Sequence, residues 1–369
     1  MIYNRIKVIL KKFCFQGEYQ DVEELTSGNV NQTYRLFYDD EGKQRQYVLQ
    51  RINGYVFKEP ECVMNNIVQV TEHLRRNMEA IGEYVDGRVL EIVKTTEGES
   101  FVKDSFGGVW RAYVFIENAI APDIVENLDM MREVGRGFGH FQRLLVDFPA
   151  QDLYVPIPNF HNTTKRFYAF VRAVDEDKAG RVKKVEKEIE FFFERRKMMN
   201  RIVKLLEDGT LPLRVTHNDT KSNNVMMDKT TGKAVCVIDL DTVMPGSSLY
   251  DYGDAVRFGA STAAEDEPDT SKIALDMDKV RAFTEGFVEE TNGFLPEEEL
   301  RLLPLGIQVI TCELAMRFLT DYIDGDLYFR VNSPKHNLIR ARAQMALLED
   351  IEKKQDQLDA MIDELLRRK

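Results

Sequence analysis

Acidic and amide side chains that could do chemistry are concentrated between residues 217 and 241. The segment H-N-D-T-K-S-N-N at 217–224 places Asp219 two residues after His217 and five residues before Asn224. A second acidic pair, Asp239 and Asp241, follows an apolar run at 235–238. The turn residues T-T-G at 230–232 separate two apolar stretches. We therefore predict a hairpin that returns Asp239 to the neighbourhood of Asp219 and Asn224.

Two carboxylates and an amide in this arrangement suit phosphoryl transfer, in which an enzyme mostly positions groups and neutralises charge. One carboxylate must receive the proton of the acceptor hydroxyl, and oxygen ligands can hold Mg²⁺ against phosphates. Taken singly, Asp219 and Asn224 could be turn residues and Asp239 a strand end, but their order around one hairpin favours function. We expect His217 to have a scaffolding role, because the nearest other histidine is the distant His161.

Charge and composition limit the class of protein. The chain has 369 residues, 43% of them hydrophobic, and a net charge of −12. This negative balance argues against nonspecific nucleic-acid binding. The four cysteines are scattered, which fits a reducing compartment, and no apolar run approaches the roughly 18 residues of a membrane span. We expect a cytoplasmic protein with no membrane, nucleic-acid or obligate protein partner.

Hydrophobic patterning predicts the elements that position these residues. We expect a β-rich lobe over residues 1–116, with a helix that begins at Pro60, and a larger helical lobe over residues 117–369. Predicted strands in the first lobe are 33–38, 46–52, 88–94, 98–103 and 109–116. Predicted helical regions in the second are 128–145, 163–206 and a terminal helix at 337–369, with an acidic loop at 265–278. Three glycines at 135, 137 and 139 lie within a helical pattern, which indicates close helix packing rather than nucleotide binding.

The motif H-x-D-x-x-x-x-N at 217–224, with I-D-L-D at 238–241, resembles the catalytic and metal-binding segments of the kinase-like superfamily. It is most similar to the aminoglycoside phosphotransferase-like small-molecule kinases, since no A-P-E sequence of the protein kinases follows. The segments at 47–53, 237–246, 250–258, 317–322 and 325–329 are similar to the N-acetylhexosamine 1-kinases. The similarity spans about residues 20–350. It implies an α+β, bilobal protein-kinase-like fold with a small antiparallel lobe.

The resemblance also implies roles for individual residues on the nucleotide side. Asp219 would be the catalytic base, Lys221 would approach the transferring phosphate, and Asn224 with Asp239 would hold Mg²⁺. ATP would be covered by a hairpin that includes Gly28, Asn29, Val30, Asn31 and Thr33.

The strand lysine that usually touches the phosphates is absent. Gln50 or Arg51 occupies its position, and the strand register decides which of them points inward. Glu61 could pair with such a cation or could complement the dipole of its helix. Phe115 and Ile116 fall at the hinge, where the backbone would meet adenine.

On the acceptor side the resemblance points to Arg317, Tyr328 and Asp241, with Asp219 holding the acceptor hydroxyl. Other readings stay open. Arg317 could belong to an ion-pair ladder with Glu313 and Asp321 on one helix face. Tyr328 could fill core, and Asp241, like Asp254, could anchor the catalytic loop.

These residues predict an enzyme that uses ATP and Mg²⁺ to phosphorylate the anomeric hydroxyl of an N-acetylhexosamine, so its small-molecule partners are a sugar and a nucleotide. One alternative is a kinase for an aminoglycoside or another small hydroxylated molecule, for which the acidic loop at 265–278 could form a pocket. A nucleotide-binding pseudokinase scaffold is a second alternative. The intact set of Asp219, Asn224 and Asp239 argues against it.

Overall fold

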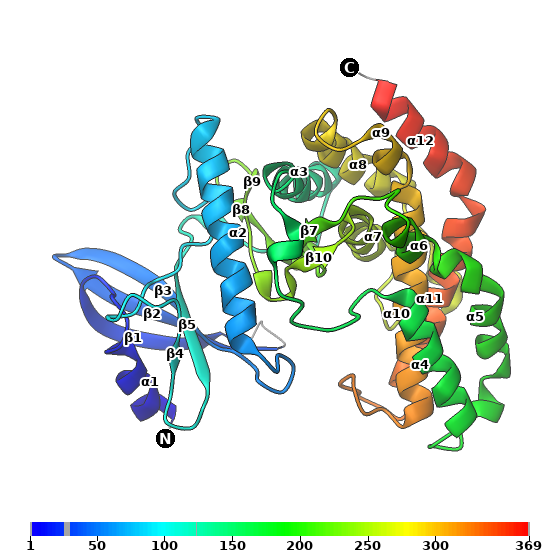
Figure 1. Ribbon diagram of the computed structural model, residues 1–369, viewed down its shortest axis with the longest axis horizontal. Helices are drawn as coiled ribbons and strands as arrows, with labels where there is room; N and C mark the ends of the chain where they lie inside the picture. The colour runs from blue at the N-terminus through cyan, green and yellow to red at the C-terminus, as the bar shows by residue number, and fades with distance from the viewer. Residues whose placement is uncertain (1, 26–29, 123, 368–369) are drawn as a thin grey trace.

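The computed structural model describes residues 2–25, 30–122 and 124–367 and has two lobes (Figure 1). In the described part of the small lobe an antiparallel sheet has the strand order β1-β2-β3-β5-β4. Its strands are β1 (Glu18–Leu25), β2 (Gln32–Asp40), β3 (Lys43–Arg51), β4 (Val102–Lys103) and β5 (Val109–Val114). Helix α1 (Ile2–Leu10) packs against one face of this sheet, and α2 (Pro60–Ala80) lies on the side of the large lobe (Figure 1).

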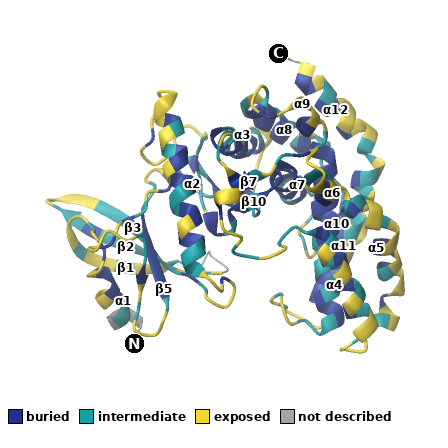
Figure 2. Cartoon of the chain, in the orientation of Figure 1, coloured by how far each residue is buried: buried dark blue, intermediate teal, exposed yellow. Residues whose placement is uncertain are grey.

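The large lobe is mainly helical and confirms the predicted bilobal α+β fold. Its α-helices are α3 (Leu128–Leu144), α4 (Thr163–Glu176), α5 (Glu186–Met199), α6 (Arg201–Glu207), α7 (Ser248–Gly259), α8 (Met277–Thr291), α9 (Glu297–Arg301), α10 (Leu303–Asp324), α11 (His336–Lys353) and α12 (Gln355–Arg367). Strand β6 (Ala119–Ile120) pairs with β8 (Val225–Asp228), which pairs with β9 (Ala234–Val237), and β7 (Arg214–Thr216) pairs with β10 (Met244–Gly246). Exposed residues lie mainly on the outer helices, whereas α7 consists mostly of buried residues, drawn in dark blue (Figure 2).

The chain passes from one lobe to the other between β5 and β6, that is, between Val114 and Ala119. The predicted boundary after residue 116 lies inside this short crossing. The lobes also share a hydrophobic cluster, in which Val63 and Ile67 of α2 pack with Phe141 of α3 and Val243. Helix α2 is therefore held by both lobes and can transmit the position of one to the other.

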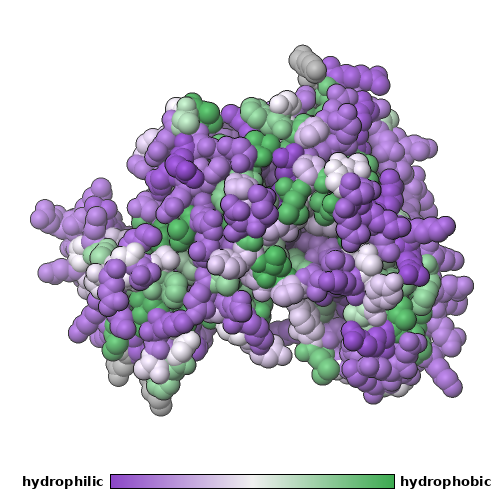
Figure 3. All heavy atoms as spheres, viewed as in Figure 1, coloured by the Kyte–Doolittle hydropathy of each residue, from purple (hydrophilic) through white to green (hydrophobic). Residues whose placement is uncertain are grey.

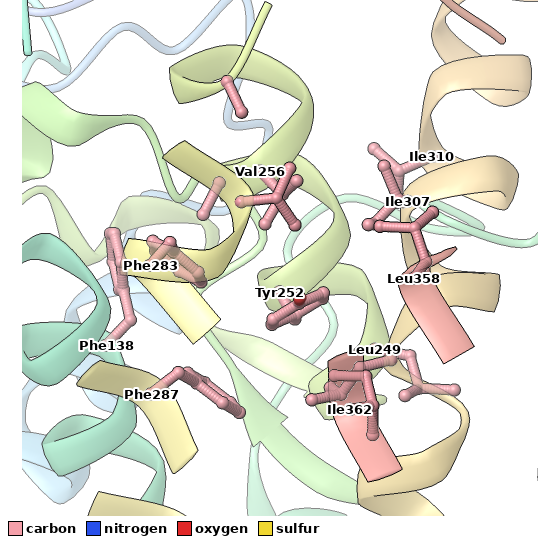
Figure 4. Close-up of a cluster of buried hydrophobic side chains, with 14 of the residues drawn as sticks. Phe138, Leu249, Tyr252, Val256, Phe283, Phe287, Ile307, Ile310, Leu358 and Ile362 are labelled. Atoms are coloured by element: carbon pink, nitrogen blue, oxygen red, sulfur yellow. The ribbon is translucent and has the colours of Figure 1, made fainter. Parts of the chain in front are cut away.

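Helix α7 lies at the centre of the large lobe and carries the residues that fasten the catalytic loop. Tyr252 is fully buried between Phe283 and Phe287 of α8 (Figure 4). Its hydroxyl is hydrogen-bonded to Thr284 at 2.7 Å. Because side chains packed in a core have little freedom to move, we expect α7 to be rigid.

Several predicted elements differ from the structure. Residues 88–94 do not form a regular strand: Val93 N–H donates to Ala112 and Val114 N–H to Glu91, but the pairing stops there. The predicted strand at 98–103 shortens to β4. The terminal helix is broken at Lys354 into α11 and α12. Strand β1 went unpredicted, because it is an exposed edge strand with the polar sequence E-Y-Q-D-V-E-E-L.

Helix α10 is long and apolar enough, by length and composition, to cross a membrane, although no such stretch was expected. Within its most apolar window, 78% of the residues are buried inside the protein, as in a core helix. It packs against α7, α4 and α11. We read it as the central helix of the large lobe.

The three glycines of α3 serve close packing, as predicted. A Cβ at Gly135 would lie 2.1 Å from the carbonyl oxygen of Phe283, and one at Gly139 would lie 2.8 Å from that of Phe287. The opposing Gly286 of α8 likewise approaches the Arg132 carbonyl. Neither helix can carry a side chain at these points without moving apart.

We expect Gly135→Ala to lower the free energy of unfolding by roughly 1–2 kcal/mol, measured by urea denaturation. Overpacking of this size should exceed the gain of about 1 kcal/mol that alanine brings to a helix, because the clash is with backbone. Gly54→Ala is the matched control, since a Cβ at Gly54 meets nothing within 4 Å. Equal stability of the two variants would contradict the packing argument.

Candidate active site

The catalytic loop follows β7 and is fastened to α7 by one buried carboxylate. Asp251 accepts hydrogen bonds from the backbone N–H groups of His217 and Asn218, both at 2.8 Å, and from Gln142 Nε2 at 2.7 Å. Asn218 has the left-handed backbone angle φ +64°, a conformation that costs a non-glycine residue of order 1–3 kcal/mol. The two bonds to Asp251 hold this strained turn in place.

His217 has the scaffolding role that the sequence predicted. Its Nδ1 accepts a hydrogen bond from Asp219 N–H at 3.3 Å, so Nε2 carries the proton and donates to the Ile238 carbonyl at 2.8 Å. The ring lies edge-on to Phe138 and Phe141 in the core. One imidazole thus joins the catalytic loop to the end of β9, directly before Asp239.

The hairpin brings Asn224 and Asp239 together, as the sequence predicted. Ile238 N–H donates to the Asn224 carbonyl at 2.9 Å, and the Asn224 side-chain amide donates to the Asp219 carbonyl at 2.7 Å. This leaves the Asn224 side-chain oxygen as a possible ligand. Asp239 takes the left-handed conformation, φ +60°, and the residue as a whole is exposed, although its carboxylate lies among other charged groups.

The carboxylates at this point repel one another. Partial desolvation, together with the neighbouring carboxylates of Asp241 and Asp219, raises the pKa of Asp239 to about 6, against an opposing effect of Arg111. A divalent cation would relieve this repulsion. Among the described residues no group of three or more His, Cys, Asp or Glu side chains could hold a metal alone. Two oxygen ligands from the protein fit Mg²⁺, which is commonly bound by one or two side chains together with the phosphates of a substrate.

Lys221 lies beside the predicted base. Its Nζ is 2.9 Å from Asp219 Oδ1. Burial opposes the charge of Lys221, but the carboxylates of Asp219 and Asp254 outweigh burial and raise the pKa of Lys221. Asp254 also accepts a hydrogen bond from Thr220 N–H at 3.0 Å and is paired with Arg257 at 2.8 Å. Asp254 is thus an anchor of the loop.

Half-buried apolar side chains from both lobes pack against the hydrophobic cluster that the lobes share: Val48, Ile116, Met226 and Ile238. Of the predicted hinge pair, Phe115 donates its N–H to the Gln46 carbonyl and so belongs to the sheet, whereas Ile116 is the first residue beyond it. The face shown in Figure 3 is hollowed between the two lobes.

The predicted phosphate-covering hairpin is described in part. Gly28 and Asn29 lie outside the described residues. Val30 is exposed, and Thr33 accepts a hydrogen bond from Gln50 Nε2 at 3.1 Å. Asn31 reaches across the lobes and donates to Asp241 Oδ2 at 2.6 Å.

The register of β3 resolves the choice between Gln50 and Arg51. Gln50 pairs with Arg111 of β5, and Arg51 pairs with Trp110 on the opposite face of the sheet. Arg51 NH1 donates to Gln32, so Arg51 points away from the cleft. The cation near Asp239 and Asp241 is instead the buried Arg111.

Sequence reasoning missed Arg111 because the partner strand of β3 could not be aligned in advance. A lone Arg in the apolar run V-W-R-A-Y-V was the available signal. Glu61 pairs with the exposed Lys103 and so is not the partner of a cleft cation.

Asp241 lies in the contact between the lobes. Its Oδ1 forms an ion pair with Arg111 NH1, its Oδ2 accepts from Asn31, and only 4% of the residue is exposed. These contacts do not support its predicted place among the acceptor ligands.

The predicted acceptor residues lie at the end of α10. Arg317 NH1 is 3.9 Å from the fully buried Glu313, and its guanidinium lies 5.8 Å from the Tyr328 ring, which is exposed. Asp321 does not extend the ion-pair ladder: it accepts the backbone N–H groups of residues 327–329 and so holds the loop that carries Tyr328.

Two basic groups near Glu313 were not predicted. His161 Nδ1 lies 3.0 Å from Glu313, and Arg166 Nε lies 3.9 Å from it. His161 also contributes to the field at Asp254, the anchor beside Lys221. The sequence did not indicate that these two groups lie near Glu313, because His161 comes from the segment before α4 and Arg166 from α4 itself.

The lobes, the loop and the hairpin define the kinase-like fold of phosphotransferases. An aminoglycoside phosphotransferase from Alicyclobacillus acidocaldarius has a TM-score of 0.57 at 13% identity, over 97% of this chain and 96% of that chain. A spectinomycin phosphotransferase solved with ADP and spectinomycin has a TM-score of 0.54 at 14% identity (96% and 98%). An ethanolamine kinase of Plasmodium vivax has a TM-score of 0.54 at 15% identity (88% and 82%).

Residues 21–283 match the model of the phosphotransferase enzyme family, APH. Because this match covers more than half of the chain, the protein belongs to that family. It is therefore a phosphotransferase with the fold that aminoglycoside, choline and ethanolamine kinases share.

We expect Asp239→Asn to raise the melting temperature of the metal-free protein at about pH 7.5. The raised pKa means that the charged carboxylate destabilises the fold above about pH 6, and this penalty fades as the pH falls toward the unfolded value of about 3.9. The gain over wild type should therefore shrink by about pH 5. A thermal shift assay in EDTA measures the melting temperatures of wild type and variant at both pH values. Asp175→Asn, at an exposed position, is the matched control. A variant that melts below wild type at both pH values would contradict the repulsion among the carboxylates.

Proposed function

We propose that this phosphotransferase uses ATP and Mg²⁺ to phosphorylate the anomeric hydroxyl of an N-acetylhexosamine. The observation that carries the proposal is the sign of the charge at the acceptor end. Arg166, Arg317 and His161 surround a single carboxylate, Glu313. Burial opposes the charge of Glu313, but His161, Arg317 and Arg166 outweigh burial and lower its pKa.

An excess of positive charge suits a neutral acceptor and repels a cationic one. Aminoglycosides, choline and ethanolamine are cations, so an enzyme that takes them needs acidic or aromatic walls. Here the buried carboxylate is already shared among basic groups. A neutral sugar can instead accept hydrogen bonds from Arg317 and stack on the exposed ring of Tyr328.

Three carboxylates of the acidic loop at 265–278 are paired with basic side chains of the protein. Glu265 is paired with Arg257 at 3.0 Å, Asp266 with His336 at 3.1 Å, and Glu267 with Lys272 at 3.5 Å. Because these three carboxylates already have partners within the protein, they are less available to a polycationic aminoglycoside, which supports the proposal of a neutral acceptor.

The catalytic groups have distinct tasks in this proposal. Asp219 receives the proton of the acceptor hydroxyl, and Lys221, 2.9 Å away, faces the transferring phosphoryl group. Asn224 and Asp239 would hold Mg²⁺, which when bound neutralises charge on the phosphates. A pseudokinase would have no need of the strained loop that aligns Asp219.

We further propose a cytoplasmic location, without nucleic-acid, membrane or obligate protein partners. All four cysteines lie in the described part of the chain and are free, which suits a reducing compartment.

A panel of acceptors tests the proposal by mass detection of the product. We expect a sugar 1-phosphate from N-acetylglucosamine or N-acetylgalactosamine, and no product from their methyl glycosides, whose anomeric hydroxyl is blocked. Asp219→Asn serves as the inactive control, with a loss of about 10²–10⁴ in rate. Preference for kanamycin, choline or ethanolamine over every N-acetylhexosamine would refute the proposal.

We expect Arg317→Ala to raise the KM for the sugar by roughly tenfold to a hundredfold, because one charged hydrogen bond in a buried site contributes about 1.5–3 kcal/mol. The KM for ATP should change less than about threefold. Steady-state kinetics with each substrate varied separates the two effects. Arg172→Ala, which removes an exposed arginine of the neighbouring α4, is the matched control; an equal rise in both KM values would move Arg317 out of the acceptor site.

A further inference from the structure

The small lobe places its buried cation on β5 instead of β3. Gln50 and Arg111 are direct cross-strand partners, so their side chains leave the sheet on the same face. Arg111 donates from Nε and NH2 to Gln50 Oε1 at 3.0 and 2.8 Å. Gln50 in turn donates to Thr33 of β2 at 3.1 Å. Three neighbouring strands thus fix the direction of one guanidinium.

The remaining arm of that guanidinium crosses to the large lobe. Arg111 NH1 forms an ion pair with Asp241 Oδ1, and both residues are almost completely buried. Asp241 lies in the 3-10 turn Leu240–Thr242, two residues after Asp239. A contact made by Asp241 therefore acts on the turn that begins at the proposed metal ligand.

Asp241 also receives a second part of the small lobe. Asn31, which precedes β2, donates to Asp241 Oδ2 at 2.6 Å, and its own side-chain oxygen accepts Asn53 N–H beyond the end of β3 at 3.0 Å. We call Arg111, Asp241 and Asn31 the interlobe clasp. It joins β5, the start of β2 and the metal-binding turn.

The clasp matches the charge pattern of the cleft. Asp219, Asp239 and Asp241 are close enough to repel one another, and Lys221 is engaged with Asp219. The charge of Arg111 acts on Asp241 by direct contact and on Asp239 through space. Removal of this charge would leave both acidic residues of the turn without their basic neighbour.

We propose that Arg111 is a positioning residue for phosphoryl transfer. By its ion pair with Asp241 it fixes the turn that carries Asp239. The position of this turn is then defined relative to the sheet that covers the nucleotide. Arg111 supplies from β5 a charge that the sequence led us to expect on β3. This inference rests on nucleotide binding in the cleft and on the phosphotransferase chemistry of the family. It does not depend on which molecule is the acceptor.

Arg111→Met alone leaves Asp241 buried and unpaired, so this variant could fail to fold. The test therefore uses the double variant Arg111→Met/Asp241→Asn, in which both charges are removed and the pair is neutral. If the pair only stabilises the fold, the double variant should work at the wild-type rate. If the pair positions the turn, the folded double variant should lose rate.

We expect the double variant to keep a wild-type circular dichroism spectrum and to lose roughly 10²-fold in kcat/KM for MgATP, the cost of a misplacement of about 1 Å. The KM for the acceptor should stay within about twofold. Arg111→Lys should retain more activity than the double variant, because an ammonium can still pair with Asp241. Arg45→Met removes a partly exposed Arg–Asp pair of the same sheet and is the matched control.

MgADP affinity, measured by titration calorimetry, gives a readout without any acceptor. We expect it to fall at least about tenfold in the double variant and to be unchanged in Arg45→Met. A wild-type kcat/KM and MgADP affinity in the folded double variant would overturn the proposal. If that variant does not fold, Arg111→Met/Asp241→Leu, which replaces the buried pair by two apolar side chains, decides, and a wild-type rate in it would equally overturn the clasp.

Discussion

The buried carboxylate of Asp251 is the group on which the geometry of the site depends. It lies in the core without a basic partner and is satisfied by two backbone N–H groups and one side-chain amide. Hydrogen bonds to a charged group are worth about 1.5–3 kcal/mol each, while burial of an ion costs several kcal/mol. Burial outweighs the hydrogen bonds and raises the pKa of Asp251. The hydrogen bonds to Asp251 hold the catalytic loop in a strained conformation.

From that point the site is built outward in two steps. The first stays within the large lobe: His217 connects the loop to β9, and Ile238 N–H connects β9 to Asn224, so the proposed base and the two proposed metal ligands are linked to one another by hydrogen bonds. The second step joins the lobes through Asp241. Its partners, Arg111 and Asn31, both belong to the small lobe. The nucleotide side is thus assembled across the cleft, while the catalytic loop is assembled beneath it.

This division explains how far the sequence could predict the site. The hairpin that brings the segments of Asp219, Asn224 and Asp239 together could be predicted, because only five residues link β8 to β9 and their proximity is a local property. Gln50 and Arg111 are 61 residues apart, and their pairing depends on a register that no local pattern fixes. The same holds for His161 and Glu313, which are 152 residues apart. Asp251 was visible as part of a motif, but its task depends on burial, which a sequence does not display.

Charge is distributed unevenly along the path that a phosphoryl group would follow. The nucleotide end carries the carboxylates of Asp239 and Asp241 and one buried arginine, which favours a metal cation with its phosphates, and Asp219 lies between the two ends. The acceptor end carries Arg166, Arg317 and His161 around one carboxylate. Transfer to a neutral sugar moves negative charge from the first end toward the second, where basic groups would stabilise it. Transfer to a cationic acceptor would require that acceptor to bind against those groups beforehand. In the proposed reaction the acceptor therefore becomes anionic only as it receives the phosphoryl group, beside basic groups that are already in place.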